Sequence, residues 1–364
     1  MSEAPVFAKG RDLDAAARAL RPWLAARLGV DDVRLENLVY PLGAGVSNET
    51  ILFEAEAEAA GAGAGAGAGR VHELVLRVAP APKHQMFFEP RFRMQYDMLV
   101  TLRRLGTVRV PEALWFEDDP ALLGQPFYLM RRMRGRVPVS MPVYNATGWL
   151  TEATPVERRT LWEGAMRQLA AIHATPMEEF AFLHRPDHGA PGDDQQLTYW
   201  GKFAAWALED EVPDPVHELL AWVTDNRPPT STPGLSWGDA RIGNMMFGDD
   251  YRVIGVMDWE QASLAGPMAD LGWWLLFDDI HSFEHGIARL DGLGTRQETL
   301  DYWRELTGRP VEHLYWNEVF AGLKAGLLAL HTRRSMKLPA AGRPNPFIER
   351  SRRLLGLTKS VELS

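Results

Sequence analysis

Cysteine is absent from the 364 residues of this chain. Without thiols the chain forms no disulfide, no thiolate zinc site, no iron–sulfur cluster and no cysteine nucleophile. An excess of basic residues is lacking too, because 39 Lys and Arg stand against 48 Asp and Glu, which gives a net charge of −9. Bulk charge of this sign does not suit the phosphate backbone of DNA or RNA. We therefore expect no nucleic-acid partner.

Long apolar runs are also missing. In the tryptophan-rich region the longest apolar stretch is Leu271–Phe277, which is far below the roughly 20 residues that a membrane-spanning helix needs. The first residues of the printed sequence contain no apolar core of signal-peptide length. From these two features we expect no membrane partner and a cytoplasmic protein.

Strand patterns dominate the first third of the chain. Residues 33–59 predict a strand, a glycine-rich turn and a second strand, and segments 71–78 and 127–133 predict two more. The glycine and alanine run at 61–69 carries no packing information, so we expect a flexible connection between antiparallel neighbours. The length of the chain suits about two domains, and we place the N-terminal one at 1–133.

Helical patterns dominate the remainder, 134–364, which we predict to be a second domain. Thr154 to Glu157 forms a capping-box sequence with proline at the first helical position, which predicts a helix start there. Residues 177–196 are rich in proline, glycine and aspartate and predict an exposed loop. Two further helices are predicted in the first domain, at 12–28 and 92–105.

A hairpin near residue 250 carries the residues with the clearest chemical potential. Two apolar runs flank the turn-rich tetrad 248–251, and a turn near 249–250 places Asn244 opposite roughly residue 255. Asp258 then lies just beyond the open end, and Asp239 lies on the loop that enters the hairpin. Two carboxylates and an amide oxygen are hard ligands that suit Mg²⁺. Aspartates are also common in turns and caps, and this second interpretation stays open from the spacing alone.

The order of these residues matches that of the protein-kinase catalytic and metal loops, D-x-x-x-x-N, strand, turn, strand, Asp. The chain resembles the aminoglycoside phosphotransferase/choline-kinase-like family, in particular the branch with kinase-like domains fused to some acyl-CoA dehydrogenases. The resemblance covers about residues 35 to 330. It rests on the segments LGAGVSNETILF, LVLRVAP, GQPFYLMRRMRGR, LAAIHATP, LSWGDARIGNMMF and VIGVMDWEQASLAGPMADLGWW.

The resemblance implies an α+β, protein-kinase-like bilobal fold, with a small antiparallel-sheet N-lobe and a larger, mostly helical C-lobe. It implies ATP-dependent phosphorylation of a hydroxyl on a small molecule. Asp239 is then the catalytic base, Asn244 and Asp258 are the Mg²⁺ ligands, and Arg77 is the cation that contacts the phosphates. Asp270 is expected to brace the catalytic loop by accepting from N–H groups of residues 238–243.

The nucleotide is expected to contact residues of the N-terminal domain. A glycine-rich hairpin tip lets backbone N–H groups approach phosphates, and Gly43, Gly45, Ser47 and Asn48 form such a tip. Backbone groups between Arg131 and Met133 are expected to hydrogen-bond the adenine.

Three positions depart from the family pattern. Trp237 stands where His is common, and it is expected to pack in its place. Arg77 stands where many kinases have Lys, and Gln95 falls near the position of its carboxylate partner, with Glu89 and Asp97 nearby. This missing partner keeps open an alternative function as an inactive nucleotide-binding or scaffold protein with a kinase-like fold.

The acceptor is not readable from the sequence. An aminoglycoside, a hydroxyacyl thioester, a sugar and an amino alcohol all stay open, as does the choice between ATP and GTP. In the family, the region after the bracing aspartate lines the acceptor pocket, so residues 278–285 are the first candidates for substrate contact. His281 and His285 in this segment, like His173 earlier, are expected to be structural.

Overall fold

The computed structural model of the chain describes residues 10–41, 47–57, 71–209, 211–338 and 344–358. The chain forms two compact units, of which the first comprises 1–86 and 111–133 and the second comprises 87–110 and 134–364. Helix α2 (Phe92–Leu105) therefore belongs to the second unit. The division into domains at residue 133 stays a prediction.

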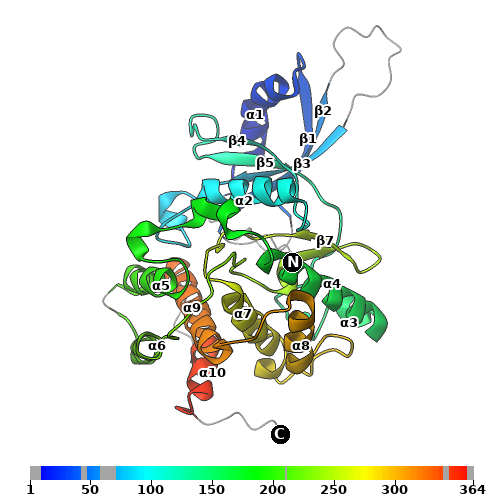
Figure 1. Cartoon of the computed structure of the whole chain (residues 1–364). Helices are drawn as coiled ribbons and strands as arrows, with labels where there is room; N and C mark the ends of the chain where they lie inside the picture. Colours follow the sequence, from blue (N-terminus) through cyan, green and yellow to red (C-terminus); the bar gives the residue numbers. More distant parts are fainter. Residues whose placement is uncertain (1–9, 42–46, 58–70, 210, 339–343, 359–364) are drawn as a thin grey trace. The chain divides into compact units, whose positions relative to one another are not determined.

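A five-stranded antiparallel sheet in the order β1-β2-β3-β5-β4 forms the centre of the first unit (Figure 1). Its strands are β1 (Val33–Val39), β2 (Glu49–Ala57), β3 (Val71–Val78), β4 (Ala113–Glu117) and β5 (Phe127–Arg131). Strands β2 and β3 pair directly, with Thr50 opposite Arg77, which confirms that antiparallel neighbours flank the glycine and alanine run. That run itself lies outside the described residues. Strand β5 ends at Arg131, two residues before the predicted end.

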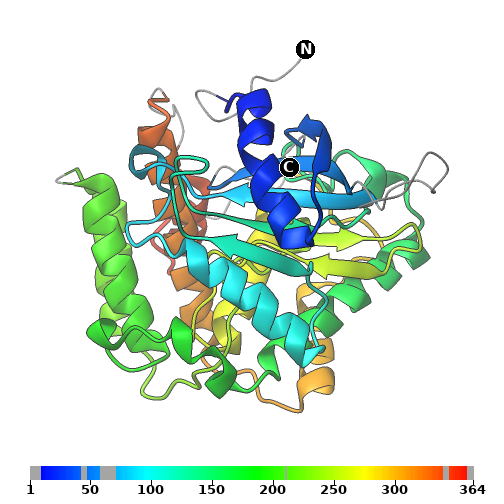
Figure 2. The ribbon, with the colours of Figure 1, turned by 90° about the horizontal axis from the view of Figure 1, so that it is seen from above.

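Helix α1 (Leu13–Leu28) covers one face of this sheet (Figure 2). Asp12 caps its start by accepting from the backbone N–H of Ala15, and Gly29 ends it in the left-handed conformation. Leu20 and Leu24 are four residues apart, so both lie on the same face of the helix and pack into the core against the sheet. Complete burial of each such side chain stabilises the unit by about 1.5–3 kcal/mol.

The second unit is mostly helical. Besides α2 it contains α3 (Trp149–Glu152), α4 (Pro155–His173), α5 (Asp193–Leu208), α6 (Asp214–Asp225), α7 (Pro267–Ile280), α8 (Arg296–Thr307), α9 (Leu314–Ser335) and α10 (Pro346–Leu354). The capping box of Thr154 and Glu157 is formed at the start of α4, as predicted. Figure 1 shows α9 between α5 and α6 on one side and α7 on the other. Across the described ranges, no helix combines the length and the apolar character required to cross a bilayer; the cytoplasmic location stays a prediction.

The prediction of an exposed loop at 177–196 is wrong. Short 3-10 turns occupy 177–183 and 186–188, and helix α5 begins at Asp193. Phe180 and Leu183 are fully buried, and the turn at 177–183 packs against α2. Proline and glycine fix local turns, but their presence does not reveal that the apolar residues between them pack against a distant helix.

The predicted hairpin is formed by β6 (Met245–Phe247) and β7 (Val253–Val256), with a register that differs from the expected one by two residues. Asn244 lies opposite Met257, whose N–H donates to the Asn244 carbonyl over 2.9 Å. The reason is the turn, because Gly248 and Arg252 close it and Tyr251 adopts a positive φ of 61°. Such a three-residue connection with a left-handed residue is longer than the two-residue turn that we assumed.

Candidate active site

Asp239 lies on the loop between helix α6 and the β6–β7 hairpin, directly after Gly238. Gly238 has a φ of 92°, and a Cβ atom there would lie 2.3 Å from the backbone oxygen of Gln261. Both its conformation and this close approach require glycine. The glycine therefore lets the loop pass against the segment that follows Asp258.

Two donors hold one carboxylate oxygen of Asp239. Arg241 Nε donates to Oδ1 over 3.0 Å, and Trp273 Nε1 of helix α7 donates to the same oxygen over 2.7 Å. Within the described chain no donor reaches Oδ2. The carboxylate is thus fixed in direction through Oδ1 alone.

Arg241 connects Asp239 to the rest of the site. Its Nη1 donates to Ser140 Oγ over 2.7 Å, and its guanidinium lies 5.3 Å from the ring centre of Phe277. Burial lowers the pKa of Arg241, but the Asp239 carboxylate, which also accepts from it, and the charge of Asp258 raise this pKa above its usual value. The two aspartates predicted from the sequence therefore act on the same guanidinium.

Asn244 is fixed to the loop that carries Asp239 and to the hairpin. Its Nδ2 donates to the Asp239 carbonyl over 3.0 Å, so Oδ1 is the atom that this side chain can offer to a ligand. Asp258 adopts a left-handed φ of 62°, a conformation that is uncommon outside glycine and that occurs at active sites. The oxygen donors of Asn244 and Asp258 fit Mg²⁺, which takes few protein ligands and completes its shell with phosphate and water. No group of three His, Cys, Asp or Glu side chains in the described ranges could hold a metal ion.

Asp270 at the start of α7 is completely buried and braces this loop. Its oxygens accept from the N–H of Trp237 at 2.7 Å, the N–H of Gly238 at 2.8 Å and the hydroxyl of Ser236 at 2.7 Å. The prediction placed the donors at 238–243, and the structure places them at 236–238. The reason is that Ile242–Asn244 forms a 3-10 turn of its own.

Trp237 is buried at the family's His position, and its Nε1 donates to the Met257 carbonyl over 2.8 Å. The indole therefore joins the loop that carries Asp239 to the strand end before Asp258. This contact agrees with the expectation that the ring packs in place of the histidine.

His173 at the end of α4 is a second brace, which sequence reasoning treated only as a core residue. Its Nδ1 accepts from the indole N–H of Trp303 over 2.9 Å, so the ring proton is on Nε2, which donates to Asp270 over 3.0 Å. The distance along the chain between His173 and Asp270 leaves no sequence signal for this pair. Only the packing of α4 against α8 and α7 brings these side chains together.

In the first unit, Arg77 Nη1 donates to Thr50 Oγ1 over 2.8 Å, across the β2–β3 pair. Asn48, just before β2, is buried, and Ser47 is half-buried. The predicted phosphate contacts at Gly43 and Gly45 lie outside the described residues.

The segment expected at the adenine has its backbone donors partly in use. The N–H of Arg131 donates to the Glu112 carbonyl over 2.9 Å, and the N–H of Arg132 donates to the Glu73 carbonyl over 3.0 Å. Of the three N–H groups in this segment, the one of Met133 is therefore the candidate for a ligand.

The acidic residues in the last turn of α7 and just after the helix are neutralised by arginines. Asp278 pairs with Arg289, Asp279 pairs with Arg350, and Glu284 pairs with Arg353. His281 in the same segment is buried, and burial together with the nearby Arg241 charge lowers its pKa to about 4. The contact of this region with a substrate stays a prediction, but its carboxylates are not free to receive a polycation.

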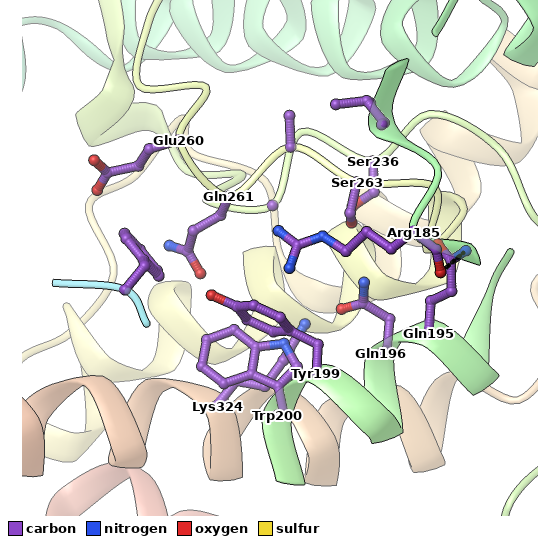
Figure 3. Close-up of a pocket in the computed structure, with 14 residues that line it drawn as sticks. Arg185, Gln195, Gln196, Tyr199, Trp200, Ser236, Glu260, Gln261, Ser263 and Lys324 are labelled. Carbon is purple, nitrogen blue, oxygen red and sulfur yellow. Dashed lines mark hydrogen bonds between the residues drawn. The ribbon is translucent and has the colours of Figure 1, made fainter. Parts of the chain in front are cut away.

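A cavity lies within the second unit, beside Gly238 (Figure 3). It holds about 40 Å³ of free space, which exceeds the volume that one water molecule needs. Its polar walls are Arg185, Gln196, Tyr199, Glu260, Gln261 and Lys324. Sequence reasoning selected none of these residues, because they come from four separate segments of the chain.

A family model described as "Phosphotransferase enzyme family" matches residues 39–309. Two curated proteins are similar over part of their length. A protein of Arabidopsis thaliana named probable acyl-CoA dehydrogenase IBR3 is 28% identical over 65% of this chain and 27% of its own length. Acyl-CoA dehydrogenase family member 11 of Gallus gallus is 30% identical over 45% of this chain and 20% of its own length. The chain thus spans about a quarter of these relatives, and the matches confirm the resemblance expected from the motifs.

Solved structures share the fold at low identity. A candidate aminoglycoside phosphotransferase from Ralstonia eutropha JMP134 superposes with a TM-score of 0.66 and 22% identity, covering 93% of this chain and 96% of that chain. The macrolide 2′-phosphotransferase MphH from Brachybacterium faecium superposes with a TM-score of 0.51 and 20% identity, covering 88% of this chain and 98% of that chain. The protein of the streptomycin-ATP-APH(2″)-IIa ternary complex superposes with a TM-score of 0.51 and 15% identity, covering 86% of this chain and 89% of that chain. These similarities establish the kinase-like α+β fold expected from the sequence.

Proposed function

This chain belongs to the phosphotransferase enzyme family, and from that premise we propose that it transfers the γ-phosphoryl group of ATP to a hydroxyl of a small molecule. The observation that carries the proposal is the state of Asp239. Trp273 and Arg241 hold its Oδ1, no described donor reaches Oδ2, and Asn244 lies on the same loop. A carboxylate held in this way can orient an acceptor hydroxyl and take its proton.

The proposed roles divide between the two aspartates. Asp239 accepts the proton as the acceptor oxygen bonds to the γ-phosphorus and the bond to the β-phosphate oxygen breaks, which releases ADP. Asn244 Oδ1 and Asp258 are the residues that would hold Mg²⁺, which when bound neutralises phosphate charge. The hydrogen bond that Asn244 Nδ2 donates and the one that the Asn244 backbone carbonyl accepts keep the side-chain amide oriented for this role.

In the first unit, Arg77 is proposed to contact the phosphates. The Thr50 hydroxyl accepts from Nη1, which ties the guanidinium to the neighbouring strand, and a planar guanidinium suits phosphate oxygens. The N–H of Met133 is proposed to donate to the adenine.

Two variants test the division of labour. Asp239→Asn should retain Mg-ATP binding and lower turnover by about 10²- to 10⁴-fold, the usual contribution of one general base. Asp258→Ala should lose both turnover and the Mg²⁺-dependent part of ATP binding. Calorimetry with ATP in the presence and absence of Mg²⁺ measures the binding, and release of ADP during acceptor screening measures turnover.

Equal losses of Mg-ATP affinity in both variants would contradict the proposed roles. Nucleotide binding without turnover on any acceptor would instead favour the alternative of an inactive nucleotide-binding protein. Absence of any calorimetric or thermal response to millimolar Mg-ATP would reject both.

A further inference from the structure

Lys324 on helix α9 is a buried cation that contacts aromatic rings but has no carboxylate partner in the part of the chain that the structure describes. Its side chain lines the cavity beside Gly238, and Figure 3 shows it rising from α9 behind the rings of Tyr199 and Trp200. Only 6% of Lys324 is exposed. Across the ranges that the structure describes, its ammonium group forms neither a hydrogen bond nor an ion pair. A buried ammonium group is costly unless a partner satisfies its N–H donors.

Aromatic rings and two aspartates surround this ammonium group. Nζ lies 5.4 Å from the ring centre of Trp273, 5.3 Å from that of Phe320 and 6.0 Å from that of Trp200. Burial lowers the pKa of Lys324 to about 8, against the raising effect of the Asp270 and Asp193 charges. The rings favour a cation, but they accept no hydrogen bond of ordinary strength. The site is therefore charged and incompletely satisfied.

We propose that this cavity binds a carboxylate group of the phosphate acceptor through Lys324, so that the acceptor class is a hydroxy acid. The inference rests on the proposed phosphotransfer, because it takes the ligand of the cavity to be the acceptor. The shared chemistry of carboxylates and phosphate esters is an oxyanion, and the charges around the cavity decide between them.

A monoanion fits the charges better than a phosphate dianion. Arg185, the other cation of the cavity, is already paired with Glu89 and lies over the ring of Tyr199 at 4.3 Å. Lys324 is then the one cation of the cavity walls in the described chain that has no carboxylate partner. Glu260 is turned away from the other labelled side chains in Figure 3, so it leaves the space near the lysine to an anion.

Neutral donors complete the carboxylate site. The side-chain amides of Gln196 and Gln261 and the hydroxyl of Tyr199 line the same cavity (Figure 3). Each can donate a hydrogen bond to a second carboxylate oxygen. The cavity has room for a small group of this kind, since its free space is about 40 Å³.

The cavity lies next to the proposed base. Gly238 lines it and Asp239 is the next residue, and a single indole ring separates the two functional groups. Trp273 contacts Lys324 through its ring and Asp239 through its N–H. An acceptor held by its carboxylate at Lys324 would therefore lie against Gly238, on the loop that carries Asp239.

A polycationic acceptor is disfavoured by the same charges. It would meet the Lys324 ammonium in the cavity, and the carboxylates of Asp278 and Glu284 are already paired with arginines. Attraction of a polycation requires unpaired carboxylates near the site.

The test compares three ligand series of matched length on the full chain. These are straight-chain ω-hydroxy acids, their neutral primary amides, and the corresponding amino alcohols, with inorganic phosphate as the alternative oxyanion. Calorimetry and thermal shift without nucleotide measure binding independently of turnover. We expect binding of the hydroxy acids and a loss of about tenfold to a hundredfold in affinity for the amides, which is the range of one charge-assisted hydrogen bond.

Variants assign the effect to Lys324. Lys324→Met should remove the preference for hydroxy acids over amides, and Lys324→Gln is a second variant in case the first does not fold. Lys202→Met, at an exposed lysine of α5 outside the cavity walls, is the matched control and should keep the preference. Circular dichroism verifies the fold of each variant.

The outcomes separate the two proposals. Four results would each overturn the carboxylate site. These are equal affinity for acids and amides, stronger binding of the amino alcohols, a preference for acids that survives in Lys324→Met, and selective binding of phosphate. Lysine-dependent binding of hydroxy acids without ADP release in the presence of Mg-ATP would uphold the site and overturn the phosphotransfer. Release of ADP with amino alcohols would uphold phosphotransfer and overturn the carboxylate site.

Discussion

Trp273 donates its indole N–H to Oδ1 of Asp239 over 2.7 Å. The tryptophan comes from the core of helix α7 and is almost completely buried, so a rigid hydrophobic element sets the direction of the proposed base. Arg241 adds a charged donor to the same oxygen. A proton acceptor that is held by packing is preorganised, so little reorientation is needed during the reaction.

Replacement of Trp273 by phenylalanine should remove this hydrogen bond and keep most of the ring packing. Arg241 still holds Oδ1, so we expect the turnover number to fall by about tenfold, at the lower end for a hydrogen bond to a charged group. The Michaelis constant for ATP should change little. Steady-state kinetics measures both constants. The control is Trp274→Phe, a buried neighbour on the same helix without contact to Asp239; an equal loss of turnover in this control would argue against the role of the indole N–H.

Asp270→Ala should lower stability and activity together. The substitution leaves the N–H groups of Trp237 and Gly238 and the hydroxyl of Ser236 without their acceptor. Breaking such a buried network costs about 3–5 kcal/mol, which corresponds to a fall of about 10 °C in melting temperature. Thermal unfolding measures the effect. Asp239→Asn keeps an oxygen that can accept from Trp273 and Arg241, so this variant should melt near the parent temperature. An inactive Asp270→Ala variant of unchanged stability would place Asp270 among the catalytic groups.

Gly238→Ala should disrupt the catalytic loop. The new Cβ would lie 2.3 Å from the Gln261 backbone oxygen at a φ of 92°, so the loop has to move. We expect a loss of several kcal/mol in unfolding free energy and a large fall in turnover. The matched control is Gly201→Ala in α5, where a Cβ would meet no atom within 4 Å. That variant should gain about 0.5–1 kcal/mol in urea unfolding; a destabilised control would show that the packing argument is wrong.

Lys324 should make stability depend on pH in the alkaline range. Burial lowers its folded-state pKa to about 8 from 10.5, although Asp270 of α7 and Asp193 of α5 oppose the shift; Arg185 and Glu260 line the same cavity. A lowered pKa of a basic group means that the charged form opposes folding, so its penalty disappears as the pH rises from about 8 to 10.5.

The parent should therefore gain roughly 3 kcal/mol of unfolding free energy relative to Lys324→Met across that interval. Urea unfolding of both proteins at a series of pH values isolates the effect, because all other titrating groups are shared. A difference that stays constant with pH, or that falls as the pH rises, contradicts the prediction.

Local patterns were sufficient for most elements of the fold. The four-residue spacing of Leu20 and Leu24, the apolar and β-branched residues of 71–78 and the capping box at Thr154 each depend on neighbours within a few residues, and the structure contains the corresponding helices and strand. The hairpin was found as well, but its register was wrong by two residues because turn length depends on one left-handed residue, Tyr251.

The sequence by itself determined the order of Asp239, Asn244 and Asp258 around a hairpin, because these residues lie within twenty positions and their spacing is set by local geometry. Only the tertiary structure decided what holds them. His173, Trp303 and Asp270 form a buried chain of hydrogen bonds from three helices, and Lys324 reaches the cavity from a fourth. Contacts of this kind depend on how helices pack, and helix packing follows from the whole hydrophobic core rather than from any short segment.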